Sequence, residues 1–182
     1  MSKVLIPLAE GFEELEAITI IDLLRRAGVE VTVAGLSDGP ITASRGVVVM
    51  ADMSLDDALS QEYDMVVLPG GAVGSDNLNE DPRVLELLKR MANSERFTAA
   101  ICAAPKVLAS AGVLAGHKIT AYPGVMGALQ NKDFTDSGEA VVADGKIITS
   151  RGPGTAMDFA LVLIAELAGD AKRREIENQL KR

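Results

Sequence analysis

The sequence is poor in the residues on which disulfides, zinc sites and base-stacking surfaces depend. Its 182 residues contain one cysteine, one histidine and no tryptophan, and aromatic residues make up only 3%. One cysteine cannot close an internal disulfide, and one cysteine with one histidine cannot complete a structural zinc site. So few aromatic rings also argue against a surface on which nucleobases stack. We therefore expect a single-domain chain of a reducing compartment without a bound metal.

An excess of basic charge and long apolar runs are missing as well. The formal net charge is -8, so we do not expect nucleic acid as the main partner. No apolar run reaches the roughly 20 residues that a membrane-spanning helix needs. Met1-Ser2-Lys3 leads directly into a strand-like run and does not resemble a signal peptide. We expect a cytoplasmic protein that does not associate with membranes.

The chain does contain short apolar runs that alternate with amphipathic stretches. Strands are predicted over 4–8, 29–34, 47–50, 65–68, 97–101 and 118–121. Helices are predicted over 14–26, 82–93, 155–168 and, as a charged surface helix, 170–182. Asp144-Gly145 lies between two apolar runs and predicts a hairpin over 140–150. The alternation predicts one α/β domain over residues 1–182, a flavodoxin-like three-layer sandwich with a mostly parallel sheet.

The only cysteine, Cys102, lies where a strand-like run meets the start of a helix. Ala100 and Ala104 flank it at two positions on either side, which is the spacing of a nucleophile elbow. Pro105 suits the first turn of the following helix, whose positive end would favour a thiolate. On this hypothesis the thiol pKa lies below its free value of about 8.5. A cysteine that only fills the core is an equally good explanation of this stretch taken alone.

Two glycines follow another predicted strand and should lie at the same sheet edge as Cys102, because ligands bind at the carboxyl ends of parallel strands. Gly70 and Gly71 allow a close approach of backbone to a ligand. A backbone N–H there and the N–H of Ala103 would form an oxyanion hole. Taken alone, the glycine pair is better explained by a tight turn between strand and helix.

Three glutamates, Glu13, Glu14 and Glu16, stand at the start of the first predicted helix. Acids at this place complement the helix dipole, and this explanation is sufficient by itself. If Glu16 instead faces Cys102 in an apolar pocket, its pKa rises. A protonated carboxyl can then donate a hydrogen bond to a thiolate and move protons during a reaction. The two interpretations remain open at the level of the sequence.

The single histidine, His117, is the default partner for a catalytic cysteine. It precedes the predicted strand at 118–121 and therefore belongs at the edge opposite Cys102. We interpret it as an ordinary surface residue.

Five stretches together resemble the ThiJ/PfpI superfamily, also written DJ-one, and in particular its DJ-one-like branch. They are Gly11-Phe12-Glu13-Glu14-Leu15-Glu16, Arg25-Arg26-Ala27-Gly28, Val66-Val67-Leu68-Pro69-Gly70-Gly71, Ala99-Ala100-Ile101-Cys102-Ala103-Ala104-Pro105 and Thr149-Ser150-Arg151-Gly152-Pro153-Gly154-Thr155. The resemblance covers nearly the whole chain and implies a flavodoxin-like fold and a homodimer. It implies a reactive Cys102 and an acid, Glu16, that touches it. The oxyanion-hole and pocket residues that it implies are Gly71 and Ala103, and Gly70, Tyr122 and Arg151.

The resemblance also implies an activity without a cofactor. Members of the superfamily are described as glyoxalases that convert methylglyoxal to lactate and as deglycases that repair glyoxal-type adducts on proteins. Others are described as chaperones or sensors of oxidative stress that respond through oxidation of the cysteine. This sequence departs from many members at Tyr122, which precedes Pro123 where those members have histidine. The departure weakens any interpretation as a Cys–His protease or amidase.

Overall fold

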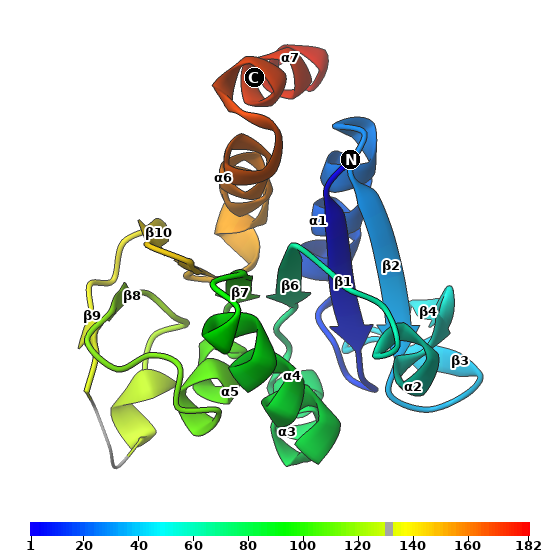
Figure 1. Cartoon of the computed structure of the whole chain (residues 1–182), viewed down its shortest axis with the longest axis vertical. Coiled ribbons are helices and arrows are strands. Elements are labelled where there is room, and N and C mark those ends of the chain that lie inside the picture. The colour runs from blue at the N-terminus through cyan, green and yellow to red at the C-terminus, as the bar shows by residue number, and fades with distance from the viewer. Residues whose placement is uncertain (130–132) are drawn as a thin grey trace.

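The computed structural model describes residues 1–129 and 133–182 and has a central sheet with helices on both faces (Figure 1). Its strands are β1 (Lys3–Leu8), β2 (Glu30–Gly35), β3 (Pro40–Thr42), β4 (Val48–Met50), β5 (Met53–Ser54), β6 (Met65–Leu68), β7 (Phe97–Ile101), β8 (Lys118–Ile119), β9 (Thr135–Asp136), β10 (Val141–Asp144) and β11 (Ile147–Ser150). Its α-helices are α1 (Glu14–Arg26), α2 (Leu55–Ala58), α3 (Ala72–Glu80), α4 (Pro82–Asn93), α5 (Pro105–Ser110), α6 (Ala156–Ala168) and α7 (Asp170–Gln179). Two 3₁₀ turns, η1 (Met126–Ala128) and η2 (Pro153–Thr155), complete the described elements.

The main sheet has seven strands in the order β10-β11-β7-β6-β1-β2-β5. All neighbours are parallel except β10 and β11, which form the antiparallel hairpin predicted around Asp144-Gly145. Successive residues of β1 enter different cores: Ile6 packs with α1 and α6, and Leu5 packs with α2, α4 and α5. Burial on both faces explains why the central strands are continuous apolar runs. The predicted mostly parallel three-layer sandwich is confirmed.

The sheet order brings three turns together at one edge. Strand β6 lies between β1 and β7, so the chain leaves all three strands at their carboxyl ends within one region. In Figure 1 the arrowhead of β1 points to this edge, and both chain termini lie at the other end of the molecule. The three turns carry Gly11, the pair Gly70 and Gly71, and Cys102. This arrangement is the usual place for a ligand site in such sheets.

Some elements differ from the sequence-based expectations. The predicted strand at 47–50 is β4, but it pairs only with β3 in a separate hairpin, and β8 pairs with β9 outside the main sheet. Thr155 is the N-cap residue of α6, but its side chain makes no capping hydrogen bond to that helix. Its hydroxyl instead lies 2.7 Å from that of Ser150 and donates to the Gly152 carbonyl oxygen, so it closes the η2 turn.

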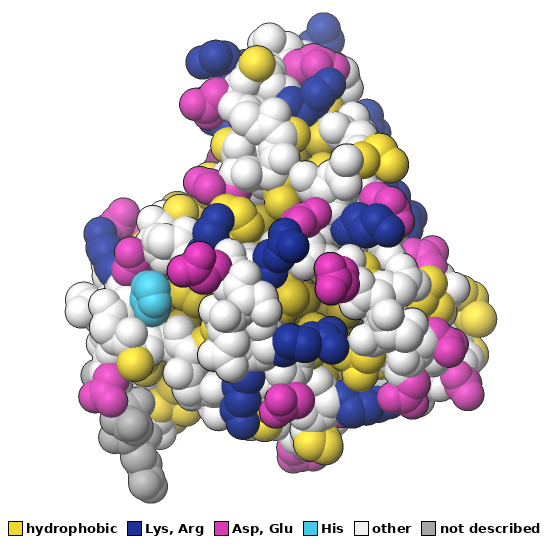
Figure 2. Space-filling view, viewed as in Figure 1, with side chains coloured by type: hydrophobic (Ala, Val, Ile, Leu, Met, Phe, Trp, Pro, Cys, Tyr) yellow, Lys and Arg dark blue, Asp and Glu magenta, His cyan; other side chains and the backbone are white. Residues whose placement is uncertain are grey.

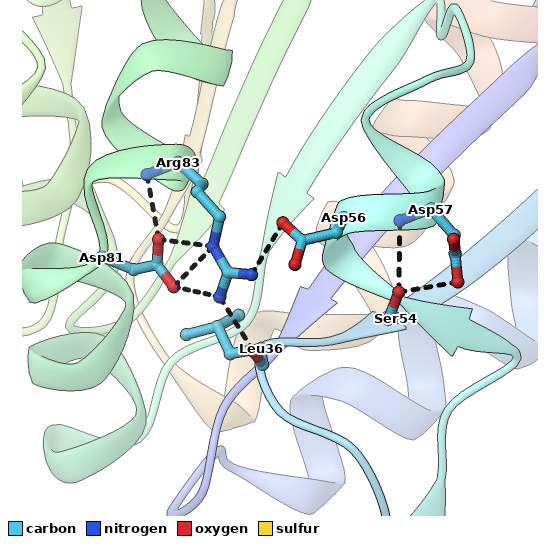
Figure 3. Close-up of polar contacts among 6 residues, drawn as sticks. All are labelled: Leu36, Ser54, Asp56, Asp57, Asp81 and Arg83. Atoms are coloured by element: carbon cyan, nitrogen blue, oxygen red, sulfur yellow. Dashed lines mark hydrogen bonds and ion pairs between the residues drawn. The ribbon is translucent and has the colours of Figure 1, made fainter.

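One guanidinium ties three elements together near the carboxyl end of β2 (Figure 3). Arg83 in α4 contacts both carboxylate oxygens of Asp81 and donates to Asp56 in α2, at 2.9 Å. It also donates to the Leu36 carbonyl oxygen just beyond β2, at 2.8 Å. One planar guanidinium thus donates to two carboxylates and a carbonyl oxygen at the same time. The compact ammonium group of a lysine could not make this set of hydrogen bonds. The network fixes the start of α4 against α2 and the end of β2.

The surface carries charges of both signs. On the face shown in Figure 2, Lys and Arg side chains alternate with Asp and Glu side chains. Within the described residues, no helix is both long enough and apolar enough to cross a membrane.

Candidate active site

Cys102 lies in a sharply bent turn between β7 and α5. Its φ of 64° is in the left-handed region, which costs a non-glycine residue about 1–3 kcal/mol unless its surroundings enforce it. The surroundings do so here: the Cys102 N–H donates to Ser150 in β11 at 2.9 Å, and its carbonyl oxygen accepts from Tyr122 at 2.8 Å. The turn predicted from the flanking alanines therefore exists. It holds the thiol at the end of β7, where 8% of the residue is exposed.

Glycine is required on the neighbouring turn because the packing leaves no room for side chains. A Cβ at Gly70 would stand 2.5 Å from the Glu16 Oε2 atom and 2.6 Å from the Cys102 Cβ atom. Gly71 has a φ of 91°, and a side chain there would overlap the carbonyl oxygen of Gly11. The glycine pair thus does more than complete a tight turn. It lets the backbone of the β6–α3 connection lie directly against Glu16 and Cys102.

Glu16 in the first turn of α1 points inward and is fully buried. Its Oε2 atom accepts a hydrogen bond from the Gly70 N–H at 2.8 Å, and Oε1 has no hydrogen-bond partner among the described residues. Burial raises the pKa of Glu16 from 4.5 to about 7, and the charge of Glu13 adds to the rise. Hydrogen bonds from Gly70 and Cys102 oppose it. The structure therefore supports the inward-facing alternative and not a solvated acid at a helix start.

The predicted low pKa of the Cys102 thiol is wrong. Burial, together with the charge of Glu16 and its hydrogen bond, raises the pKa of Cys102 to about 12. The backbone N–H groups of Gly71 and Ala103 lie close enough to the sulfur to lower the pKa, but they do not outweigh burial. The sequence showed the helix start that favours a thiolate; it did not show how deeply the thiol is buried beside a carboxylate. Thiol and carboxylate together form one coupled pair.

A cavity of about 720 Å³ opens above the thiol. Cys102, Gly71 and Ala103 lie on its wall, so both predicted oxyanion-hole N–H groups belong to residues that face it, and so does Tyr122. Gly70 lies beneath this wall, against Glu16. Arg151, expected in the same pocket, lines an adjoining hollow of about 370 Å³ instead.

Charged residues that were not predicted to belong to the site also line the cavity. Glu13 caps α1 by accepting the Glu16 N–H at 2.9 Å, and it faces the cavity as well. Arg45 reaches the cavity from the connection between β3 and β4, which the Glu14 carboxylate holds through the Arg45 N–H and the Ser44 hydroxyl. Glu13 lies within the Gly11–Glu16 stretch, so this motif could have predicted that Glu13 belongs to the site. No feature of the sequence around Arg45 indicates that it lines the cavity. No group of three or more potential metal-binding side chains occurs within residues 1–129 and 133–182.

His117 does not belong to this site. It lies just before β8, and its Nδ1 atom is 3.3 Å from the Asp144 carboxylate in β10. Tyr122, which faces the cavity, follows the other end of β8. The structure thus agrees with the interpretation of His117 as a surface residue. The thiol has a glutamate, and not a histidine, as its titratable neighbour.

The fold that carries this thiol–carboxylate pair is that of a defined family of proteins. Residues 2–166 match the model of the DJ-1/PfpI family, and the chain belongs to that family. It is 47% identical to protein dj-1beta of Drosophila melanogaster over 182 residues, which cover 99% of this chain and 97% of that protein. It is 35% identical to the glutathione-independent glyoxalase DJR-1.2 of Caenorhabditis elegans, over 92% of this chain and 89% of that protein.

Solved structures of the family have the same fold over the full length. The crystal structure of Drosophila melanogaster DJ-1beta has a TM-score of 0.94 at 46% identity, covering 99% of this chain and 98% of that chain. The oxidized DJ-1 of Toxoplasma gondii also has a TM-score of 0.94, at 39% identity and the same coverage of both chains. The resemblance inferred from the five sequence stretches is therefore confirmed at the level of the family.

Proposed function

We propose that this protein converts α-oxoaldehydes such as methylglyoxal to hydroxy acids without a cofactor. Cys102 acts as the nucleophile, and Glu16 acts as the acid and base. The observation that carries the proposal is the fully buried Glu16 carboxyl, with its pKa raised to about 7, in contact with a thiol that faces a cavity. A group that titrates near neutral pH is suited to both accepting and returning a proton. The relative named as a glutathione-independent glyoxalase supports the same activity.

The chemistry begins when Glu16 accepts the thiol proton and the sulfur attacks the aldehyde carbon. The carbonyl oxygen takes the electron pair and becomes an oxyanion, which the N–H groups of Gly71 and Ala103 stabilise until Glu16 protonates it. The product of this step is a hemithioacetal. Both donors belong to residues on the cavity wall next to the sulfur. The addition therefore requires no group beyond this site.

The second half moves a proton between the two carbons of the substrate. The Glu16 carboxylate removes the proton from the former aldehyde carbon, which gives an enediolate, and returns it to the neighbouring carbon, while the hydroxyl proton moves from the first oxygen to the second. The result is a thioester of lactate on Cys102. Water hydrolyses it to lactate and regenerates the thiol, so the balance is methylglyoxal plus water to lactic acid. No electrons are exchanged with an external donor or acceptor.

The size of the cavity supports a related reaction at the same site. A volume of about 720 Å³ exceeds what methylglyoxal fills and lies in the range of sites for larger ligands. A glycated protein side chain presents an aldehyde-derived carbon with an amine as leaving group. Attack by Cys102 and release of the repaired amine would then be a deglycase reaction. The pair Cys102 and Glu16 would have the same roles in it.

A second candidate function is that of a redox-regulated chaperone or sensor of oxidative stress. The specific observation in its favour is that Cys102 is the only cysteine, so no second thiol can trap its sulfenic acid as an internal disulfide. Oxidation would then proceed to the sulfinate. A protonated Glu16 beside it would donate a short hydrogen bond to a sulfinate oxygen. The solved structure of a relative described as oxidized Toxoplasma gondii DJ-1 supports this candidate.

One comparison separates these candidates. Purified wild-type protein and Cys102→Ala are incubated with methylglyoxal, and separately with a pre-glycated peptide, in a buffer without amines that would scavenge the aldehyde. A glyoxalase forms lactate in step with the loss of methylglyoxal, and Cys102→Ala does not. A deglycase restores the free amine of the glycated peptide. A control with a scavenger of free methylglyoxal and no enzyme measures how much amine is recovered without catalysis. If the wild-type protein does neither, the enzymatic proposal fails and the redox function remains.

The proposal includes a homodimer in the cytoplasm. Exposed apolar side chains occur on α1, at Leu15 and Ile18, and on β4, at Val48 and Met50. The hydrogen bonds of Glu14 hold the hairpin that contains β4 near the start of α1. A second copy of the chain would cover these side chains, which supports a dimer. Light scattering is expected to give twice the chain mass, and a monomer mass at working concentrations would contradict it.

A further inference from the structure

Tyr122 lies between two hollows on the surface of the site. The larger is the cavity above Cys102, and the smaller, of about 370 Å³, is lined by residues 122–123 and 151–155. Tyr122 and Pro153 line both hollows, which are therefore neighbours that share a wall. Among the described residues that line the smaller hollow, Arg151 is the charged one. The mechanism above uses only the larger cavity.

The position of the Tyr122 ring is defined by its neighbours. A Cβ built on Gly152 would stand 3.3 Å from the ring atom Cδ2 and 3.8 Å from Cε2, so the ring lies against the backbone of the turn that enters η2. The Tyr122 backbone is fixed from both sides, because its N–H donates to Cys102 at 2.8 Å and its carbonyl oxygen accepts from Val125 at 3.1 Å. Half of the residue is nevertheless exposed. The backbone is thus held while the ring occupies the boundary between the hollows.

We propose that the Tyr122 ring is a partition that limits the size of the molecules that reach Cys102. With the ring in place, the reaction cavity ends at Tyr122 and Pro153, and the hollow with Arg151 is closed off from the sulfur. Without it, the two hollows join and accommodate a substituent that extends from the reacting carbon toward Arg151. The effect is steric, so the ring matters and the hydroxyl does not. The inference concerns substrate size and rests on the proposed function only for the identity of the reacting aldehyde.

The single cysteine provides a test that does not depend on turnover. N-ethylmaleimide and N-(1-pyrenyl)maleimide carry the same electrophile on a small and a large substituent, and each alkylates one thiol in this chain, Cys102. The measured quantity is the ratio of the two alkylation rates. The rate with N-ethylmaleimide reports any change in the reactivity or folding of the site, and the ratio reports size selection alone.

Three variants distinguish the ring from the hydroxyl. Tyr122→Ala is expected to raise the pyrenyl-to-ethyl rate ratio about tenfold, the effect of relieving one strong steric overlap. Tyr122→Leu, with a side chain of intermediate size, gives an intermediate ratio, and Tyr122→Phe keeps the wild-type ratio. The partition is refuted if Tyr122→Ala leaves the ratio unchanged or raises both rates equally. It is also refuted if Tyr122→Phe changes the ratio as much as Tyr122→Ala.

A parallel measurement extends the inference to turnover. The ratio of kcat/KM for phenylglyoxal over methylglyoxal is expected to rise in Tyr122→Ala and to remain unchanged in Tyr122→Phe. If neither aldehyde is consumed by any form of the protein while the maleimide ratio shifts, the proposed glyoxalase function fails and the partition stands. If both aldehydes are consumed but neither ratio shifts, the function stands and the partition is wrong.

Discussion

Replacing Glu16 with glutamine is the sharpest test of the proposed chemistry. The substitution keeps the shape of the side chain, and its carbonyl oxygen can still accept the Gly70 N–H that now lies 2.8 Å from Oε2. The amide nitrogen can donate a hydrogen bond toward Cys102, as a protonated glutamate would. An amide does not accept and return a proton at neutral pH. Glu16→Gln therefore removes proton transfer and leaves the packing around the thiol in place.

The expected loss follows from the role of Glu16 at two points of the reaction. General acid–base catalysis by a positioned side chain contributes about 10²–10⁴-fold to a rate, which corresponds to roughly 3–5 kcal/mol of activation free energy. We expect methylglyoxal consumption by Glu16→Gln at pH 7 to fall by a factor in this range. Oxidation of Cys102 by mild peroxide should persist, because the neutral glutamine removes the Glu16 charge that raises the thiol pKa. Intact-mass measurement detects the added oxygens and a lactate assay follows turnover.

A matched control lies two residues earlier on the same helix turn. Glu14 is also an acid at the start of α1, but it binds Ser44 and Arg45 and has no contact with Cys102. Glu14→Gln should keep turnover while it removes the same helix-start charge. If Glu16→Gln turns over methylglyoxal like the wild-type protein, Glu16 is only a buried helix-start acid and the mechanism is wrong. If both variants lose turnover equally, the loss comes from helix α1 and not from proton transfer.

Three further outcomes are expected. Folding raises the pKa of Glu16 from 4.5 to about 7. Between these two pH values the folded state retains a proton that the unfolded state releases, so the free energy of unfolding falls by about 3 kcal/mol as the pH rises from 4.5 to about 7. Urea unfolding should show Glu16→Gln to be more stable than the wild type at pH 8 but not at pH 4.5. His117→Ala should retain turnover, since its ring contacts Asp144 outside the cavity; a hundredfold loss with the fold intact would mean that the site is misplaced. Arg83→Lys should lower unfolding free energy by about 1–2 kcal/mol, seen as a lower melting temperature, and an unchanged value would show that the fork to Asp81 contributes little.

The central part of the fold was predictable because its strands are buried on both faces. Strands β1, β6 and β7 appear in the sequence as continuous apolar runs, and α1 and α4 have a clear helical spacing. Helix α3 gave no such signal, since Ala72–Glu80 mixes glycine, serine and asparagine with few apolar residues. The short strands β3 and β5 carry too few residues for a period to be recognised. Their place depends on contacts with distant parts of the chain.

The identity of the site residues was easier to predict than their environment. The spacing around Cys102 and the motif that contains Glu16 pointed to both residues. Which way Glu16 faces depends on how α1 packs on the sheet, and that orientation sets its full burial. The thiol pKa was predicted in the wrong direction for the same reason: burial and the neighbouring carboxylate act through space and leave no mark on the local sequence. Arg151 lines the neighbouring hollow and not the cavity above Cys102, a placement that depends on the packing of residues 122–123 against residues 151–155.

The absence of a histidine beside the thiol changes how this site must handle protons. In a Cys–His pair the imidazole becomes a cation and stabilises the thiolate by its charge. Here the partner of Cys102 is a carboxyl group, so the thiolate is tolerated only while Glu16 holds the proton. Above the Glu16 pKa of about 7, thiol and carboxyl together hold one proton, and either arrangement of that proton leaves a single negative charge in the pocket. The raised thiol pKa places that charge mainly on Glu16, beside the Gly70 N–H, and the N–H groups of Gly71 and Ala103 favour the thiolate when the proton moves. A site that carries one shared proton and one buried negative charge is suited to moving a proton within a neutral substrate, which is what the conversion of an oxoaldehyde to a hydroxy acid requires.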